Sequence, residues 1–93
     1  MSVLILTHAA CVAHDPGPHH PECPDRWRAV TRALEAEAFS ALPHAEAPRA
    51  THEQILRVHP EAYLNAILES APAQGDRVAL DADTILSHGS IEA

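Results

Sequence analysis

The feature that most constrains this chain is a cluster of prolines between residues 16 and 24, where four of nine positions are proline. Each proline fixes its φ angle and lacks a backbone N–H, so the segment fits neither a helix interior nor a central strand. The cluster overlaps a polar stretch that reads His19-His20-Pro21-Glu22-Cys23-Pro24-Asp25-Arg26. Because so many restricted residues give a loop a definite shape, we predict that this loop positions functional side chains.

The segments on either side of this loop predict a strand and a helix. Residues 1–7 contain the continuous apolar run Val3-Leu4-Ile5-Leu6, which predicts a strand buried on both faces, as in a parallel sheet. Downstream, Pro24 fits the first turn of a helix, and Asp25 lies near the positive end of its dipole. The apolar stripe of this helix consists of Trp27, Val30, Thr31, Leu34 and Ala38.

Two further helices are predicted in the middle of the chain. Thr51 and Gln54 match the two ends of a capping box for a short helix, which must end before Pro60. Pro60 then fits the first turn of another helix, whose apolar stripe consists of Tyr63, Leu64, Ile67 and Leu68. Residues 45–49 are compatible with a short strand.

The last part of the chain predicts less regular structure. Residues 74–76 predict a turn, and residues 78–80 are a short apolar piece. Ser87 is a suitable N-cap for a helix over residues 88–93. With one or two strands predicted, no complete sheet is expected, so we interpret residues 1–93 as the opening segment of a larger α/β domain without an internal boundary.

Charge and composition disfavour several classes of function. The chain carries 13 acidic and 6 basic residues, a net charge of −7, which disfavours nucleic acid and anionic membranes as partners and favours a cationic or neutral small partner. It lacks both a long apolar run and the basic start of a signal peptide, so we expect a cytoplasmic protein with free thiols at Cys11 and Cys23. Alanine supplies much of the apolar fraction, so we expect a thin core.

Four residues in the proline-rich region have types that bind zinc. Cys11 and His14 form one pair, and His20 and Cys23 form another, whereas a structural zinc site takes four nitrogen or sulfur ligands. The prolines restrict how the intervening loop wraps around a metal. Spacing therefore favours loop histidines and cysteines that act as small buried apolar residues over a metal site.

Asp81 and Asp83 follow the apolar piece at residues 78–80. Groups just beyond the carboxyl end of a strand often reach the ligand crevice of an α/β protein. A solvated turn, in which aspartates accept local backbone N–H groups, explains the same spacing and is favoured on spacing alone. Among the basic residues, Arg26 lies beside the stiff loop and is a better functional candidate than Arg28, which fits a solvated helix face.

Several motifs recur in order along the chain: His14-Asp15-x-Gly17, His20-Pro21-Glu22-x-Pro24-x-Arg26, Ala50-Thr51-x-Glu53, Val58-His59-Pro60-x-x-Tyr63-Leu64 and Asp81-x-Asp83-Thr84. Together they closely resemble the N-terminal part of zinc-dependent histone deacetylase-like enzymes, a family that includes the bacterial acetylpolyamine amidohydrolases, and the chain looks more like the class II branch of that family. The resemblance spans nearly all of residues 3–93, and Cys23 stands where the family often has arginine.

This resemblance implies an arginase–deacetylase fold, in which helices flank a parallel sheet in three layers. It implies that Arg26 lies beside the internal channel beneath the catalytic site, that Asp83 lies on the rim that holds the substrate backbone, and that His20 belongs to the entrance loop. The zinc ligands, tandem histidines and transition-state tyrosine of the family lie downstream of the matched segment, so no catalytic or metal-ligating residue is assigned here.

The resemblance therefore implies an N-terminal fragment of a zinc-dependent deacetylase that hydrolyses acetyl-lysine or acetylpolyamine amides. In the whole enzyme, zinc would polarise the acetamide carbonyl and activate water. We expect the fragment alone to be inactive, without zinc of its own, and to associate with the remainder of the domain or with itself. Two alternatives stay open: a stand-alone zinc module built on the four cysteine and histidine residues above, and a non-catalytic interaction fragment.

Overall fold

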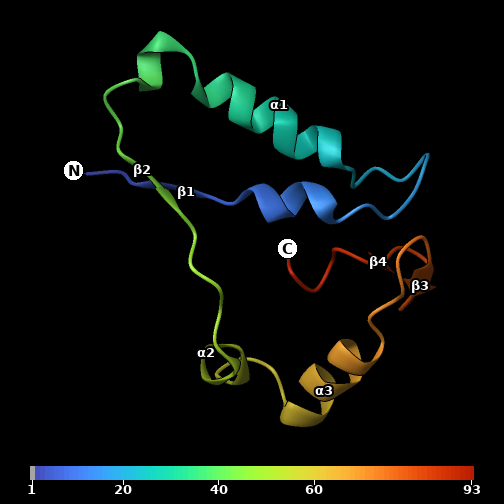
Figure 1. Cartoon of the computed structure of the whole chain (residues 1–93). Coiled ribbons are helices and arrows are strands. Elements are labelled where there is room, and N and C mark those ends of the chain that lie inside the picture. Colours follow the sequence, from blue (N-terminus) through green and yellow to red (C-terminus); the bar gives the residue numbers. More distant parts are fainter. Residues whose placement is uncertain (1) are drawn as a thin grey trace.

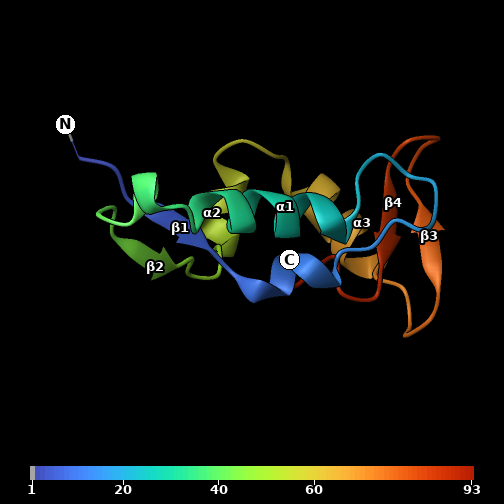
Figure 2. The same cartoon turned by 90° about the horizontal axis from the view of Figure 1, so that it is seen from above.

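The computed structural model describes residues 2–93. In Figure 1 the ribbon runs around an open ring, and the C-terminus lies toward the middle. Seen from above in Figure 2, the same elements lie in one elongated layer. In chain order the elements are strand β1 (Ile5–Thr7), 3-10 helix η1 (Ala9–Ala13), helix α1 (Pro24–Leu34), 3-10 helix η2 (Glu37–Phe39), strand β2 (His44–Glu46), helices α2 (His52–Leu56) and α3 (Glu61–Glu69), and strands β3 (Arg77–Ala79) and β4 (Ile85–Ser87).

Strands β1 and β2 form a two-stranded parallel sheet. Ile5 pairs with His44, and Thr7 pairs with Glu46. The α1 segment connects the two strands, as the geometry of a parallel pair requires. A strand and a parallel sheet were expected here from the apolar run. Strand β2 begins one residue earlier than the short strand predicted over residues 45–49 and ends at Glu46. The mixed helices and strands agree with the predicted α/β class.

The predicted strand is shorter and more exposed than its sequence suggests. It begins at Ile5 rather than at Met1, and Met1 itself lies outside the described residues. Leu4 is 55% exposed and Leu6 is 53% exposed, so the prediction of burial on both faces is wrong for residues 2–93. An uninterrupted apolar run shows that both faces of a strand are apolar. Whether those faces are buried depends on which other elements pack against them.

Helix α1 begins at Pro24, as predicted, and ends before Ala38, which belongs to η2. The indole Nε1 of Trp27 donates a hydrogen bond of 3.1 Å to Oγ1 of Thr7, which joins the apolar stripe of α1 to the end of β1. Further along the stripe, Val30 keeps 59% of its surface exposed. The stripe is therefore only partly covered by the described part of the chain.

The capping box and the second proline-started helix are both confirmed. The backbone N–H of Gln54 donates to Oγ1 of Thr51 at 3.2 Å, and the backbone N–H of Thr51 donates to Oε1 of Gln54 at 2.9 Å. Pro60 is the N-cap of α3 rather than a residue of its first turn. Of the predicted stripe, Leu64 is 7% exposed, whereas Tyr63 is 53% exposed.

Strands β3 and β4 form an antiparallel hairpin that the sequence interpretation did not contain. Val78 pairs with Leu86, and residues 74–75 form the predicted turn before β3. The prediction of a helix with Ser87 as its N-cap is wrong: Ser87 is the last residue of β4, and residues 88–92 form turns. A serine hydroxyl can accept a backbone N–H group at the end of a buried strand just as it can at the start of a helix, so a serine alone does not identify a helix cap.

The core within residues 2–93 is thin, as expected from the alanine-rich composition. Leu64 and Leu86 are its buried apolar side chains, at 7% and 9% exposure. The radius of gyration is 15.5 Å, compared with about 12 Å for a compact domain of this length. Hydrogen bonds between distant segments therefore contribute much of what holds the ring of elements together.

Candidate functional site

The predicted proline-rich loop, which covers residues 8–24, begins after β1 with the 3-10 helix η1. The sequence analysis did not predict this helix. His8 is its N-cap: the ring Nδ1 accepts the backbone N–H of Ala10 at 3.0 Å. The ring Nε2 of His8 lies 3.4 Å from Oε1 of Glu46 on β2. Beyond η1 the loop bends sharply, with φ of 114° at Gly17 and 69° at His19. A positive φ at a residue other than glycine is uncommon and marks a constrained loop.

A cluster of side-chain hydrogen bonds joins this loop to the C-terminal segment. The hydroxyl of Ser87, 8% exposed, donates to the carbonyl oxygen of Ala13 at 3.1 Å and accepts the backbone N–H of Asp15 at 2.9 Å. The hydroxyl of Ser90 lies 2.6 Å from Nδ1 of His14 and accepts the backbone N–H of Ser87 at 2.7 Å. The three bonds between the loop and the C-terminal segment span more than 70 residues of sequence and satisfy polar groups that are partly buried.

Two further contacts hold the same part of the loop. Nε of Arg77 on β3 donates to the carbonyl oxygen of Asp15 at 3.0 Å, and its guanidinium lies 3.6 Å from the carboxylate. On the other side, Gly89 approaches η1 so closely that an added Cβ would lie 2.4 Å from Cβ of Ala13. Residues 13–17 are therefore held between β3, the end of β4 and the turn that follows.

The guanidinium of Arg26 forms an ion pair with the carboxylate of Glu22, one helical turn earlier. Its side chain is 63% exposed. Arg28, by contrast, pairs with Asp25 at 2.7 Å on the outer face of α1, in agreement with its predicted solvated position. Arg26 and Glu22 line an open cavity of about 510 Å³ together with Cys11, His14, Cys23, Trp27, Val30, Leu86, Ser90 and Ala93.

His20 connects the proline-rich loop to the β3–β4 turn. Its ring Nδ1 accepts the backbone N–H of Glu22 at 3.0 Å, so this nitrogen carries no proton. Nε2 therefore carries the proton and donates it to the carbonyl oxygen of Asp83 at 2.8 Å. Two of the residues singled out from the resemblance, His20 and Asp83, are thus joined directly, although 63 positions separate them.

Asp81 organises the turn from inside. Its Oδ1 accepts the backbone N–H of Asp83 at 2.8 Å. This bond, together with a hydrogen bond from the side chain of Thr84, lowers the pKa of the Asp81 carboxyl from its ordinary value of 3.8. The favoured interpretation of the acid pair, a solvated turn in which an aspartate accepts local backbone N–H groups, is confirmed for Asp81.

The structure gives the two histidines among the four candidate zinc ligands other hydrogen-bond partners. His14 bonds to Ser90, and His20 bonds to Glu22 and Asp83, while the thiols of Cys11 and Cys23 are free and half-buried. Among residues 2–93, no three histidine, cysteine, aspartate or glutamate side chains gather closely enough to hold a metal ion.

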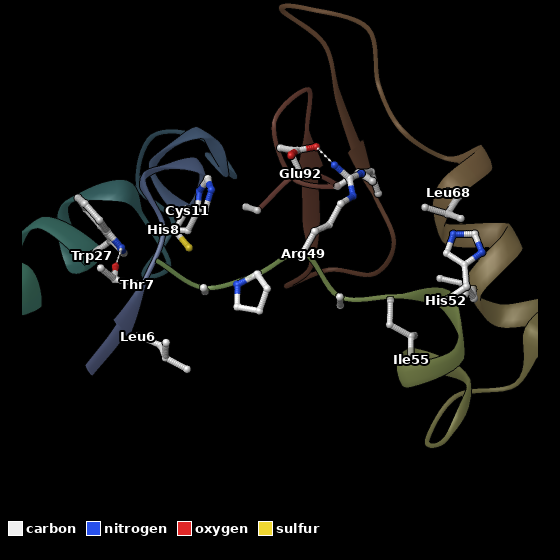
Figure 3. Close-up of a pocket in the computed structure, with 16 residues that line it drawn as sticks. Leu6, Thr7, His8, Cys11, Trp27, Arg49, His52, Ile55, Leu68 and Glu92 are labelled. Atoms are coloured by element: carbon white, nitrogen blue, oxygen red, sulfur yellow. Dashed lines mark hydrogen bonds and ion pairs between the residues drawn. The ribbon is translucent and has the colours of Figure 1, made fainter. Parts of the chain in front are cut away.

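A larger cavity of about 580 Å³ lies between the β1–α1 side of the ring and helices α2 and α3 (Figure 3). Thr7 and Trp27 line one end, whereas His52 and Ile55 line the other. Between them, the ion pair of Arg49 and Glu92, 2.5 Å long, joins the segment before α2 to the C-terminal turn. The sequence interpretation missed this pair, because its two charges are isolated and 43 positions apart.

The histone deacetylase domain, as a sequence family, matches residues 8–93 of this chain. The chain belongs to the histone deacetylase family. The uncharacterized protein slr0245 of Synechocystis sp. is 35% identical to this family member over 94 residues, which cover 97% of the chain. The chain spans 30% of the length of that curated relative.

Membership of the histone deacetylase family confirms the resemblance drawn from the loop, capping-box and aspartate motifs. The family is generally zinc-dependent. The individual roles of His20, Arg26 and Asp83 stay predictions. Within residues 2–93 no helix has the length and apolar character needed to cross a membrane.

In this deacetylase family member, the structure identifies residues around the loop that the sequence motifs did not include. Ser87, Ser90 and Arg77 all bond to the loop, and Gly89 allows the close approach to Ala13. A local signal existed for three of them, because Ser87, Gly89 and Ser90 form a Ser-x-Gly-Ser segment after an apolar piece, which is as typical of a tight turn as of a helix start. No local signal identifies the partner of Arg77.

Proposed function

We propose that this chain forms the opening segment of a zinc-dependent deacetylase domain that hydrolyses acetyl-lysine or acetylpolyamine amides. The family match over residues 8–93 carries the proposal. The connection between His20 and Asp83 supports it further, because it places a predicted entrance residue and a predicted rim residue side by side. The net charge of −7 suits a cationic amine product.

In this proposal the segment shapes the substrate entrance and supplies no catalytic group. Asp83 is exposed and would accept a hydrogen bond from the substrate backbone, while His20 would line the same rim. Arg26 would lie beside the channel beneath the catalytic site, with Glu22 as its partner. As the resemblance implies, the zinc ligands of the domain would come from residues outside this segment.

The proposal also names the partner of this segment as the rest of a deacetylase domain. Each strand of the parallel β1–β2 pair has one unpaired edge, and the side chains of Leu6 on β1 and of Leu4 just before it are exposed. A further cavity of about 490 Å³ lies between β1 and α1, lined by apolar groups that include Trp27 and Val30. Additional parallel strands would cover these surfaces and complete a three-layer fold. The exposed apolar side chains equally favour an interaction fragment that docks on a separate polypeptide.

The test is a chimera in which this chain replaces the matching segment of the Synechocystis relative. We expect the isolated chain to hydrolyse neither an acetyl-lysine peptide nor an acetylated polyamine. The chimera is expected to hydrolyse at least one of them and to lose this activity when a chelator removes zinc. The isolated chain is also mixed with the part of the relative that lies outside the matched segment. Activity in the mixture would show that the two parts can dock as separate polypeptides, whereas activity in the chimera alone would show that they must be joined in one chain.

The intact relative is the positive control, assayed on the same two substrates. An inactive chimera that is folded, alongside an active relative, would contradict the assignment of this segment to a deacetylase entrance. Substrate hydrolysis by the isolated chain would contradict the proposal that this segment supplies no catalytic group, because a catalytic centre would then lie within these 93 residues.

A second measurement addresses the stand-alone zinc module. We expect the purified and dialysed chain to retain no zinc in elemental analysis, because His14 and His20 bond to Ser90 and Asp83 instead of converging on a metal. The matched variant is Cys23→Ala. One equivalent of zinc in the native chain that disappears in the variant would establish a metal site in this loop. We also propose a cytoplasmic location, which fractionation of expressing cells would test.

A further inference from the structure

Both backbone polar groups of Asp83 have partners. Its N–H donates to Oδ1 of Asp81 at 2.8 Å, and its carbonyl oxygen accepts from Nε2 of His20 at 2.8 Å. No hydrogen bond or ion pair engages its own carboxylate within the described residues, and the side chain is exposed. The arrangement fixes the peptide groups on both sides of Asp83 and leaves its carboxylate available to a ligand.

His20 supplies the outside support of this turn. Residues 80–84 are closed by their own bonds, such as the backbone N–H of Leu80 donating to the carbonyl oxygen of Thr84 at 2.8 Å. Within the described chain, His20 is the hydrogen-bond partner that reaches this turn from the proline-rich loop. Its ring is itself oriented, because Nδ1 accepts the backbone N–H of Glu22.

We propose that His20 is a positioning residue for Asp83: it holds the 81–84 turn so that the Asp83 carboxylate faces the backbone N–H groups of an incoming substrate. This inference rests on the proposed function, which makes Asp83 a substrate-binding residue. His20 acts through Asp83 and takes no part in the chemical step. Its loss therefore weakens substrate binding and leaves the rate of bond cleavage unchanged.

The two ring nitrogens of His20 allow a matched pair of variants. The amide of asparagine places an oxygen near the position of Nδ1, so His20→Asn keeps the bond to Glu22 and loses the bond to Asp83. The longer glutamine places an N–H donor near the position of Nε2, so His20→Gln keeps the bond to Asp83. His88→Asn is the control, because His88 also bonds to a backbone carbonyl, that of Pro72 at 3.2 Å, on a different part of the surface.

The first readout is the backbone amide of Thr84, which belongs to the same peptide group as the Asp83 carbonyl. In the full chain, ¹⁵N-threonine labelling is expected to show a shifted Thr84 resonance in His20→Asn. The resonance is expected to return to its native position in His20→Gln and to stay there in His88→Asn. An unchanged Thr84 resonance in His20→Asn would overturn the inference, whatever the activity measurements show.

The second readout is steady-state kinetics of the active chimera described above. His20→Asn is expected to raise KM about two- to tenfold, the range that one net hydrogen bond supplies, with kcat unchanged, and His20→Gln is expected to restore KM. In an Asp83→Ala background, His20→Asn should have no further effect on KM. A native KM in His20→Asn, or an equal fall in kcat, would overturn the positioning role. An inactive chimera would instead refute the proposed function, while the Thr84 resonance still decides whether His20 holds the turn.

Discussion

Replacing Ser87 with alanine tests whether buried hydrogen bonds, rather than a large core, hold the proline-rich loop. The Ser87 hydroxyl is 8% exposed, accepts the N–H of Asp15 at 2.9 Å and donates to the carbonyl oxygen of Ala13 at 3.1 Å. Removing this hydroxyl therefore leaves the N–H of Asp15 and the carbonyl oxygen of Ala13 without this partner, in contacts that are partly buried. Leaving such a group unsatisfied costs about 1–3 kcal/mol.

The amide of Asp15 reports this free energy directly, because its N–H is the donor that loses its acceptor. Hydrogen exchange measured by NMR should accelerate by about 5- to 150-fold in Ser87→Ala, since each 1.4 kcal/mol corresponds to about a factor of ten. Ser40→Ala is the matched control: that hydroxyl donates to the carbonyl oxygen of Glu37 at 2.8 Å on the exposed surface. The control should change exchange at Asp15 by less than about twofold. Exchange at Asp15 that is equally slow in Ser87→Ala would refute the reasoning.

Three further predictions concern single contacts. Gly89→Ala should destabilise the chain by about 1–3 kcal/mol in urea titration, because the new Cβ would lie 2.4 Å from Cβ and 2.5 Å from the carbonyl oxygen of Ala13; unchanged stability would disprove that close approach. Thr51→Ala should cost about 1 kcal/mol through the lost capping box, whereas the neighbouring Glu53→Ala should have little effect. The lowered pKa of Asp81 means that its bond to Asp83 is stabilising above the ordinary value of 3.8 and is lost as the pH falls through the lower, folded-state pKa. In an Asp83→Asn background, which removes the side-chain carboxyl of residue 83 itself, the amide resonance of residue 83 should stay constant from neutral pH to about pH 4 and move below it. Adding Asp81→Asn should abolish this movement.

The parts of the fold that could be predicted from the sequence are those decided by neighbouring residues. Pro24 begins α1 because a missing N–H is harmless in a first helical turn. The capping box is likewise complete within four residues, Thr51 to Gln54, so its chemistry is visible in the sequence. Both predictions needed no knowledge of what packs against the helix.

The parts that could not be predicted depend on residues far apart in the chain. Each strand of the β3–β4 hairpin has three residues, too few to display a clear alternation. Ser87 was misinterpreted because a hydroxyl that accepts backbone N–H groups is equally suited to a helix cap and to its actual position beside Asp15. Of the site, the functional importance of His20 and Asp83 was inferred from the family resemblance, but the bond that joins them was not, because 63 residues separate the pair.

The contacts between distant residues mostly join the same two segments, the proline-rich loop and residues 77–90, and this bears on function. Four residues or backbone groups of the proline-rich loop bond to the segment from β3 to the C-terminal turn: Ala13 with Ser87, His14 with Ser90, Asp15 with Arg77 and Ser87, and His20 with Asp83. The prolines restrict the loop internally, but they do not place it relative to the rest of the molecule. The hairpin segment supplies that placement through polar bonds, which depend on geometry more strongly than apolar contacts do. The loop and the hairpin therefore form one structural unit, and a substitution in residues 77–90 should disturb the predicted substrate entrance as directly as a substitution in the loop itself.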